Sequence, residues 1–145
     1  VRGYPESVVA GDDVVIASLE YRFHVPTAFG TSEPGRWGDK RMTEIFGSDF
    51  RWRPQQEFGR ADWDLIFKAF IDFGNTNSVD KQPGEESDTL VGTGVGVELV
   101  FKRNLSMRLD WGVALTDAGP IDLSTNEPEV ESGSNRLHFL MTLSY

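Results

Sequence analysis

Histidine, cysteine and serine are the residues that would first suggest catalysis or metal binding in this chain of 145 residues. The absence of cysteine excludes disulfides, thiolate metal sites and cysteine nucleophiles. The two histidines, His24 and His138, are far apart in sequence, and no carboxylates are grouped around either, which argues against a metal site. A serine hydrolase with His138 as base is a minor alternative, because spacing does not identify such a triad. We therefore expect no catalytic residue, no metal and no cofactor.

Charge and glycine spacing exclude two further classes of ligand. The net charge is −9, whereas nucleic-acid binding needs basic surface that replaces counterions. Gly92, Gly94 and Gly96 alternate, but Val97 stands where a dinucleotide loop needs its third glycine, and no helix is expected to follow. Since these glycines share one face of an expected strand, we interpret them as leaving space beside it.

Five segments of 10 to 12 residues carry the strict alternation of a strand whose two faces meet different environments. Ordinary globular strands are near 5–6 residues, whereas a tilted strand that crosses a bilayer needs about 9–11. No run of about 18 apolar residues predicts a transmembrane helix. The expected strands are 14–25, 64–74, 90–101, 105–116 and 136–145.

One face of these strands is apolar and the other carries full charges. A soluble sandwich would place the charges in water and would need to cover the apolar face, but no sufficiently long amphipathic helix is evident for that. A barrel would place the apolar face in lipid and the charges in a wet lumen, which we favour. The charged residues on the polar face are Glu20, Arg22, Lys68, Asp72, Glu98, Arg108 and Asp110.

The connections predict how the chain is organised. A tight turn at 102–104 and long acidic loops at 75–89 and 117–135 match the short and long connections of outer-membrane barrels. The segment 27–63 falls on the short-turn side and is an exception, an insertion with a short helix near 40–46. We expect a loop segment at 1–13 and barrel strands over 14–145. Five strands do not close a barrel, so we expect further chain to supply the rest.

Two short motifs resemble those of one barrel superfamily. Val1-Arg2-Gly3-Tyr4 resembles the VRGY/F motif, which in that superfamily lies at the tip of an extracellular loop folded into the lumen. Phe70, Asp72 and Gly74 resemble the F-x-D-x-G motif on an inner-wall strand. The resemblance implies a salt bridge between Arg2 and Asp72. Independently of it, a lumen carboxylate favours a guanidinium that engages both of its oxygens.

The last expected strand resembles the signal that outer-membrane proteins present to their assembly machinery. Its apolar row ends on an aromatic residue, although phenylalanine is the commoner ending. An ordinary edge strand is the alternative, but an exposed apolar edge is an aggregation hazard. The row consists of Leu137, Phe139, Met141, Leu143 and Tyr145.

The superfamily comprises BamA-type assembly factors, TamA-type factors and the TpsB transporters of two-partner secretion, and 1–12 looks most like the TpsB branch. The resemblance implies an all-β fold, an antiparallel up-and-down meander that forms the C-terminal part of a sixteen-stranded outer-membrane barrel with periplasmic POTRA domains. It implies no enzyme but a transporter of a secreted client protein. The alternatives are an insertase for nascent outer-membrane proteins and a passive or structural pore. The expected partners are client, membrane lipid with lipopolysaccharide, and the assembly machinery.

Overall fold

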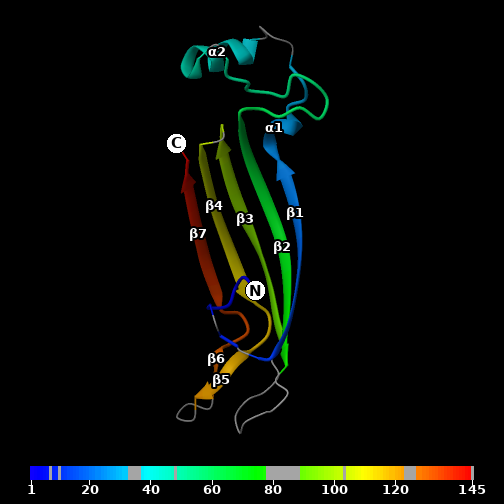
Figure 1. The fold of residues 1–145 in the computed structure, drawn as a ribbon, viewed down its shortest axis with the longest axis vertical. Coiled ribbons are helices and arrows are strands. Elements are labelled where there is room, and N and C mark those ends of the chain that lie inside the picture. The colour runs from blue at the N-terminus through cyan, green and yellow to red at the C-terminus, as the bar shows by residue number, and fades with distance from the viewer. Residues whose placement is uncertain are drawn as a thin grey trace. The chain divides into compact units, whose positions relative to one another are not determined.

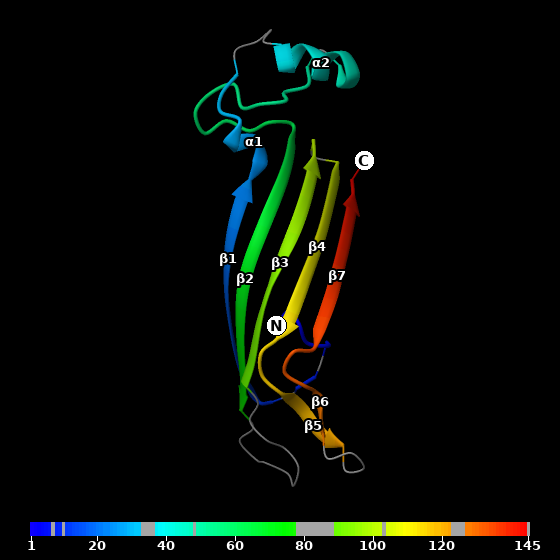
Figure 2. The same cartoon turned by 180° about the vertical axis from the view of Figure 1, so that it is seen from behind.

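A computed structural model describes residues 1–6, 8–9, 11–32, 37–47, 49–77, 89–102, 104–122 and 127–144. Five long strands form one antiparallel sheet in the order β1-β2-β3-β4-β7 (Figure 1), so the predicted five-stranded meander is confirmed. The view from behind follows the same order (Figure 2). The strands are β1 (Asp13–His24), β2 (Trp63–Asn77), β3 (Thr89–Phe101), β4 (Leu105–Ala114) and β7 (Asn135–Leu143).

The alternation of residue types becomes an alternation of exposure along β2. From Ile66 to Asn77 the inward residues are buried, and the residues between them are exposed or half-buried. The buried set includes charges: Lys68 is 3% exposed and Asp72 4%. The outward Phe67 is 52% exposed and Ile71 46%. This strand therefore buries its polar face and exposes its apolar one, the reverse of a strand in a soluble protein.

The outward apolar rows of the other strands are exposed too, although in the edge strands β1 and β7 the inward residues are also mostly exposed. Leu19 in β1 is 73% exposed, Trp111 in β4 is 46%, and Leu143 in β7 is 67%. No described helix is long and apolar enough to cross a membrane. Further exposed members of the outward rows are Val15, Tyr21, Phe23, Phe73, Val95, Leu109, Leu137, Phe139 and Met141.

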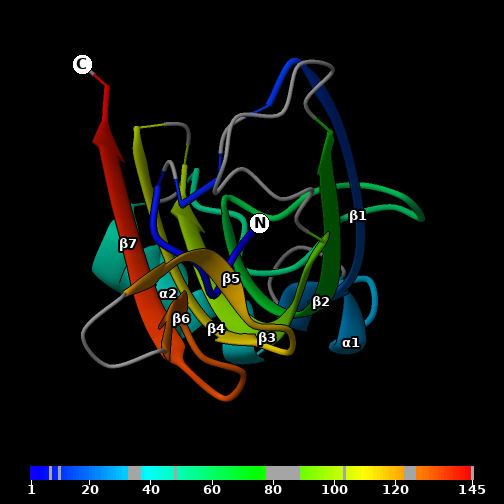
Figure 3. The same ribbon diagram turned by 90° about the horizontal axis from the view of Figure 1, so that it is seen from below.

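The chain divides into two compact units. The first comprises Val1–Tyr21, Ala69–Gly96 and Asp110–His138. In it the N-terminal segment lies against one face of the strands (Figure 3), and a small two-stranded sheet pairs β5 (Ala118–Asp122) with β6 (Glu127–Val130). The segment 117–135 was expected to be a loop, but part of it forms this hairpin, in which Ala118 pairs with Val130. The strands pair although each contains a proline, Pro120 in β5 and Pro128 in β6. The acidic residues 85–88 lie outside the described part of the chain.

The second unit comprises Arg22–Lys68, Val97–Leu109 and Phe139–Tyr145, and it contains the insertion. The short helix expected near 40–46 is present as α2 (Trp37–Phe46), and a one-turn helix α1 (Val25–Ala28) follows β1. Phe46 and Phe50 pack against Phe101 of β3, with ring centroids 5.4 and 5.7 Å away. The insertion therefore packs beside the β3–β4 turn, on the short-turn side that its position in the sequence predicts.

Two further contacts order the insertion. Trp52 and Trp63 stack with centroids 4.4 Å apart, and Trp63 donates a hydrogen bond from Nε1 to the Trp52 carbonyl at 3.0 Å. Arg51 donates from Nη2 and Nε to Asp62 Oδ1 at 2.8 and 3.0 Å. Burial alone would raise the pKa of Asp62, but the side-chain and backbone hydrogen bonds from Arg51 lower that pKa below its ordinary value. The salt bridge between Arg51 and Asp62 thus joins the two ends of the segment 51–62 in the insertion.

Candidate functional site

The candidate site is centred on Arg2, on the inward face of the first unit. Its guanidinium donates from Nε to Asp72 Oδ2 and from Nη2 to Asp72 Oδ1, both at 2.8 Å. The backbone N–H of Arg2 also donates to Asp72 Oδ2 at 3.0 Å. These two parallel side-chain bonds are the fork that arginine makes with a carboxylate and lysine does not. The structure therefore brings together the two residues for which the sequence predicts a salt bridge.

Two more carboxylates and one ring surround the same guanidinium. Arg2 Nη1 lies 2.7 Å from Glu20 Oε2 of β1 and 3.5 Å from Asp110 Oδ2 of β4. The guanidinium carbon lies 3.4 Å from the centroid of the Phe70 ring, a cation–π distance. Phe70 of the inner-wall motif thus supplies an apolar contact to the guanidinium. The hydrogen bond to Asp72 is the main cause that raises the pKa of Arg2 further above its ordinary value, so Arg2 stays charged.

Glycines on the wall give the N-terminal segment its place. A Cβ on Gly92 would lie 2.1 Å from the Arg2 carbonyl oxygen, and one on Gly112 would lie 2.7 Å from the Gly3 nitrogen. A Cβ on Gly74 would lie 2.7 Å from Val1 Cγ2. Real Cβ atoms do not approach other atoms so closely. The wall glycines therefore form a slot for the segment, with Gly92 and Gly112 against its backbone and Gly74 against the Val1 side chain. We define Gly74, Gly92 and Gly112 as the glycine slot.

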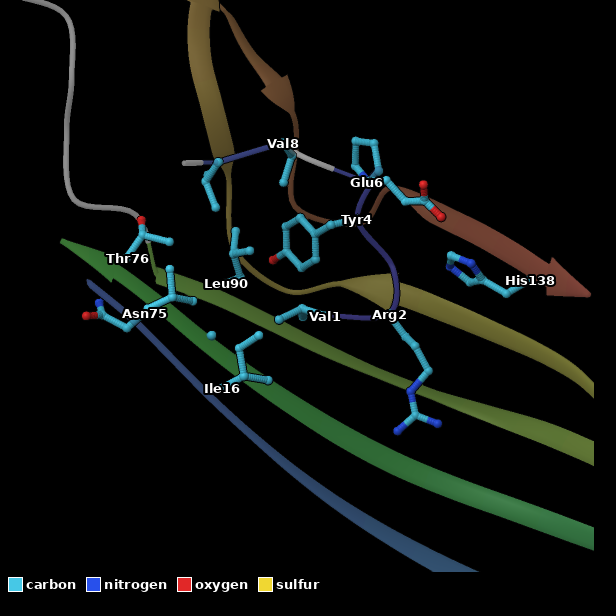
Figure 4. Close-up of a pocket in the computed structure, with 14 residues that line it drawn as sticks. Val1, Arg2, Tyr4, Glu6, Val8, Ile16, Asn75, Thr76, Leu90 and His138 are labelled. Carbon is cyan, nitrogen blue, oxygen red and sulfur yellow. The ribbon is translucent and has the colours of Figure 1, made fainter. Parts of the chain in front are cut away.

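Gly3 and Tyr4 complete the motif in the same slot. Gly3 has a φ of +100°, a left-handed conformation that favours glycine, and it lies against the β4 backbone at Val113 and Ala114. Tyr4 is 2% exposed, and its hydroxyl lies 2.8 Å from the Thr116 carbonyl oxygen and 2.9 Å from the Val91 carbonyl oxygen. The side chains of Arg2 and Tyr4 point away from the segment in different directions (Figure 4). All four residues of the predicted loop motif, Val1 to Tyr4, thus contact the wall.

A cavity lies beside this segment in the first unit. Its volume is about 370 Å³, and it is lined by apolar side chains such as Val1, Val8 and Leu90, with Glu6 and His138 among the polar ones (Figure 4). His24 belongs to the second unit, where its Nδ1 lies 2.7 Å from Asp64 Oδ2. The two histidines therefore have different neighbours. Within the described residues, no group of histidine, aspartate and glutamate side chains could hold a metal ion.

Inward charges of the second unit pair with one another. Arg22 Nη2 lies 2.7 Å from Glu98 Oε2, and the buried Lys68 Nζ lies 3.8 Å from the same oxygen. Burying a lysine is costly without a partner, and Glu98 supplies it. The polar face predicted from the alternation is thus a row of paired charges in this unit.

The C-terminal row is partly described. Leu137, Phe139, Met141 and Leu143 are 52–67% exposed in β7, while Tyr145 lies outside the described residues. Ser144 donates from its backbone N–H to the Asn104 carbonyl at 2.8 Å, which holds the end of the strand beside the β3–β4 turn in the second unit. Both faces of β7 are exposed, with Leu140 of the opposite row at 62%, so the assembly signal stays a prediction.

Comparisons with known proteins add no relative, since no family model, no curated protein and no solved structure matches the chain. The case for a function therefore rests on the motifs and on the geometry described above.

Proposed function

We propose that this chain forms part of an outer-membrane β-barrel that moves a client protein across the membrane, as in two-partner secretion. One observation supports this most directly. The sheet exposes its apolar face, while charged residues are buried on the opposite face, where Arg2 docks. Lipid suits an exposed apolar face of long strands, and a lumen suits paired charges and a folded-in segment. The edge strands β1 and β7 would pair with further strands to close the barrel.

The site supports transport over a passive pore. An open pore has no use for a segment fixed at four successive residues, whereas a protein conduit needs an element that closes the lumen between clients. In this proposal, Arg2 and Asp72 fix the segment in the conformation that the conduit needs. Client folding or binding powers passage, and no chemical step is catalysed.

Exchanging the two charges tests the proposal in the full-length protein. Arg2→Asp and Asp72→Arg should each reduce secretion of the client, and the double exchange should restore part of it. Restoration should be partial, because the new carboxylate at position 2 would face Glu20 and Asp110. Secretion is measured alongside heat-modifiable migration, which reports whether the barrel assembles. Failure of the double exchange in an assembled barrel would contradict a direct role for the pair.

An insertase is the second candidate from the motif resemblance, and the same variants separate it from a secretion pore. Loss of assembly of other outer-membrane proteins, with client secretion unchanged, would favour the insertase. Ion conductance without either defect would favour a passive pore.

A further inference from the structure

The motif segment has a second attachment on the wall, distinct from the Arg2 cluster. Tyr4 lies two residues after Arg2, and its hydroxyl reaches the ends of two strands, beside Val91 of β3 and Thr116 after β4. A hydroxyl has one hydrogen, so it donates to one carbonyl at a time, while it accepts from the Thr116 backbone N–H at 3.1 Å. The Tyr4 ring is therefore oriented by its polar tip.

The Thr116 side chain contacts Tyr4 and two residues of β3 in this attachment. Its Oγ1 donates to the Thr89 carbonyl at 2.7 Å and accepts from the Val91 backbone N–H at 3.1 Å, and it lies 2.8 Å from the Tyr4 hydroxyl. β4 ends at Ala114; beyond it the Leu115 backbone N–H still donates to the Val91 carbonyl at 2.7 Å, and the Thr116 side chain adds a second bridge to β3. Tyr4 therefore docks where Thr116 joins the end of β4 to β3.

The β5–β6 hairpin covers the same place. Tyr4 and Val8 of the segment are buried in one apolar cluster with Ala118 of β5 and Val130 of β6, and Leu90 and Ala114 of the wall complete it. At the base of the hairpin, Ser132 donates from Oγ to the Leu115 carbonyl at 2.9 Å and from its backbone N–H to Asp117 Oδ1 at 2.6 Å. The hairpin is thus hydrogen-bonded to the residues beside Thr116.

We propose that Tyr4, Thr116 and the β5–β6 hairpin form a catch that positions Arg2 and regulates release of the segment. The catch is uncharged, whereas the Arg2 cluster is ionic, so the two hold the segment by different forces. Gly3, which is left-handed and lies against the β4 backbone, connects them. In this scheme the segment leaves the wall only after the hairpin lifts from Tyr4 and Val8. This release step rests on the proposed function, while the position of the catch does not.

Distances between spin labels test the catch in the purified full-length protein. These 145 residues have no cysteine, so Glu6→Cys and Glu127→Cys, both at exposed positions, place one label on the segment and one on the hairpin once any cysteine elsewhere in the full-length protein is replaced by serine. The labelled parent should give one narrow distance distribution. Tyr4→Phe and Thr116→Val should each broaden it by about twofold or more, because each removes the same local attachment. The double variant should broaden it no further than either single one, since the two groups act together.

Two matched variants control for generic effects. Thr93→Val removes a threonine hydroxyl that donates to the Phe70 carbonyl at 2.9 Å instead of to the Tyr4 attachment, and Tyr21→Phe removes an outward hydroxyl. Both should keep the narrow distribution. A broad distribution in the parent would overturn the catch, and so would a narrow one in Tyr4→Phe and Thr116→Val. Because no client is present in this measurement, failure of the charge-exchange test of secretion would count against the proposed function and not against the catch.

Discussion

Arg2 and Asp72 are joined by two parallel hydrogen bonds of 2.8 Å, although seventy residues separate them in sequence. Their side chains are 17% and 6% exposed, so water competes little for either. A single guanidinium also faces Glu20 and Asp110. The cluster therefore depends on Arg2 more than on any one carboxylate.

Removing the guanidinium should release the segment. Arg2→Ala leaves Asp72 and its two neighbouring carboxylates without their cation, which should cost about 3–5 kcal/mol of docking free energy. Arg2→Lys keeps the charge but loses the fork, so we expect a smaller loss of about 1.5–3 kcal/mol. Amide hydrogen exchange at Gly3 and Tyr4 measures the free energy of opening.

Arg22→Lys is the control for these variants. Arg22 pairs with Glu98 in the second unit, and its side chain is 42% exposed. Because this ion pair is more exposed, we expect Arg22→Lys to change the free energy of opening by less than about 1 kcal/mol. Equal exchange rates at Gly3 in Arg2→Ala and in the parent would contradict the role given to the cluster.

Arginine substitutions on the two faces of β1 should distinguish lipid from water. Leu19 is outward and 73% exposed, and Ile16 is inward and 67% exposed. In a bilayer, Leu19→Arg should destabilise the barrel by about 2–4 kcal/mol, whereas Ile16→Arg should cost little. Denaturant unfolding from lipid vesicles measures both. If the outward face met water, the two substitutions would be equally mild.

Filling the glycine slot should displace the segment without changing any charge. Gly92→Ala places a Cβ where the Arg2 carbonyl oxygen lies, so the segment must move. Trypsin should then cleave after Arg2 about tenfold faster, since cleavage follows the population of the open form. Ala69→Val, which adds volume on the exposed face of β2, should leave the cleavage rate unchanged. Protection of Arg2 in Gly92→Ala would show that the slot is wider than the backbone contacts indicate.

Acid should loosen the insertion through Asp62. A carboxyl whose pKa is lower in the folded chain stabilises the fold fully above its unfolded pKa of about 3.9, and this contribution is lost as the pH falls through the lower folded value. Tryptophan fluorescence of the Trp52–Trp63 stack should be constant from neutral pH to about pH 5 and change below about pH 4. In Asp62→Asn that acid-induced step should disappear. An unchanged step in Asp62→Asn would assign it to another group.

Strand alternation was readable from the sequence because each long strand has two unlike faces. The predicted bounds 14–25 and 105–116 compare with Asp13–His24 and Leu105–Ala114 in the structure. The β5–β6 hairpin was missed, because its strands are short, contain Pro120 and Pro128 and show no alternation. Its pairing depends on the apolar cluster beneath it and not on local preference.

Within the site, the motifs predicted that Asp72 pairs with Arg2, but they did not predict that two further carboxylates face the same guanidinium. Alternation placed Glu20 and Asp110 on the inward face, yet the register between strands decides whether they reach the same guanidinium. The glycines were interpreted as leaving space, and only the fold shows that Gly92 and Gly112 face the backbone of the motif itself. The Tyr4 hydroxyl partners, Val91 and Thr116, carry no signal in the sequence.

In the proposed barrel, the exposed apolar rows would reverse the usual relation between accessibility and mutational tolerance. In a water-soluble protein, positions such as Leu19, Phe67 and Leu143 would be the safest to replace with polar residues. On a surface that faces lipid they become the least permissive, while inward positions outside the buried apolar cluster accept polarity more readily. A saturation scan of β1 should therefore show tolerance with a period of two residues, permissive on the inward face except at Ser18 and Glu20, which are hydrogen-bonded to Arg2.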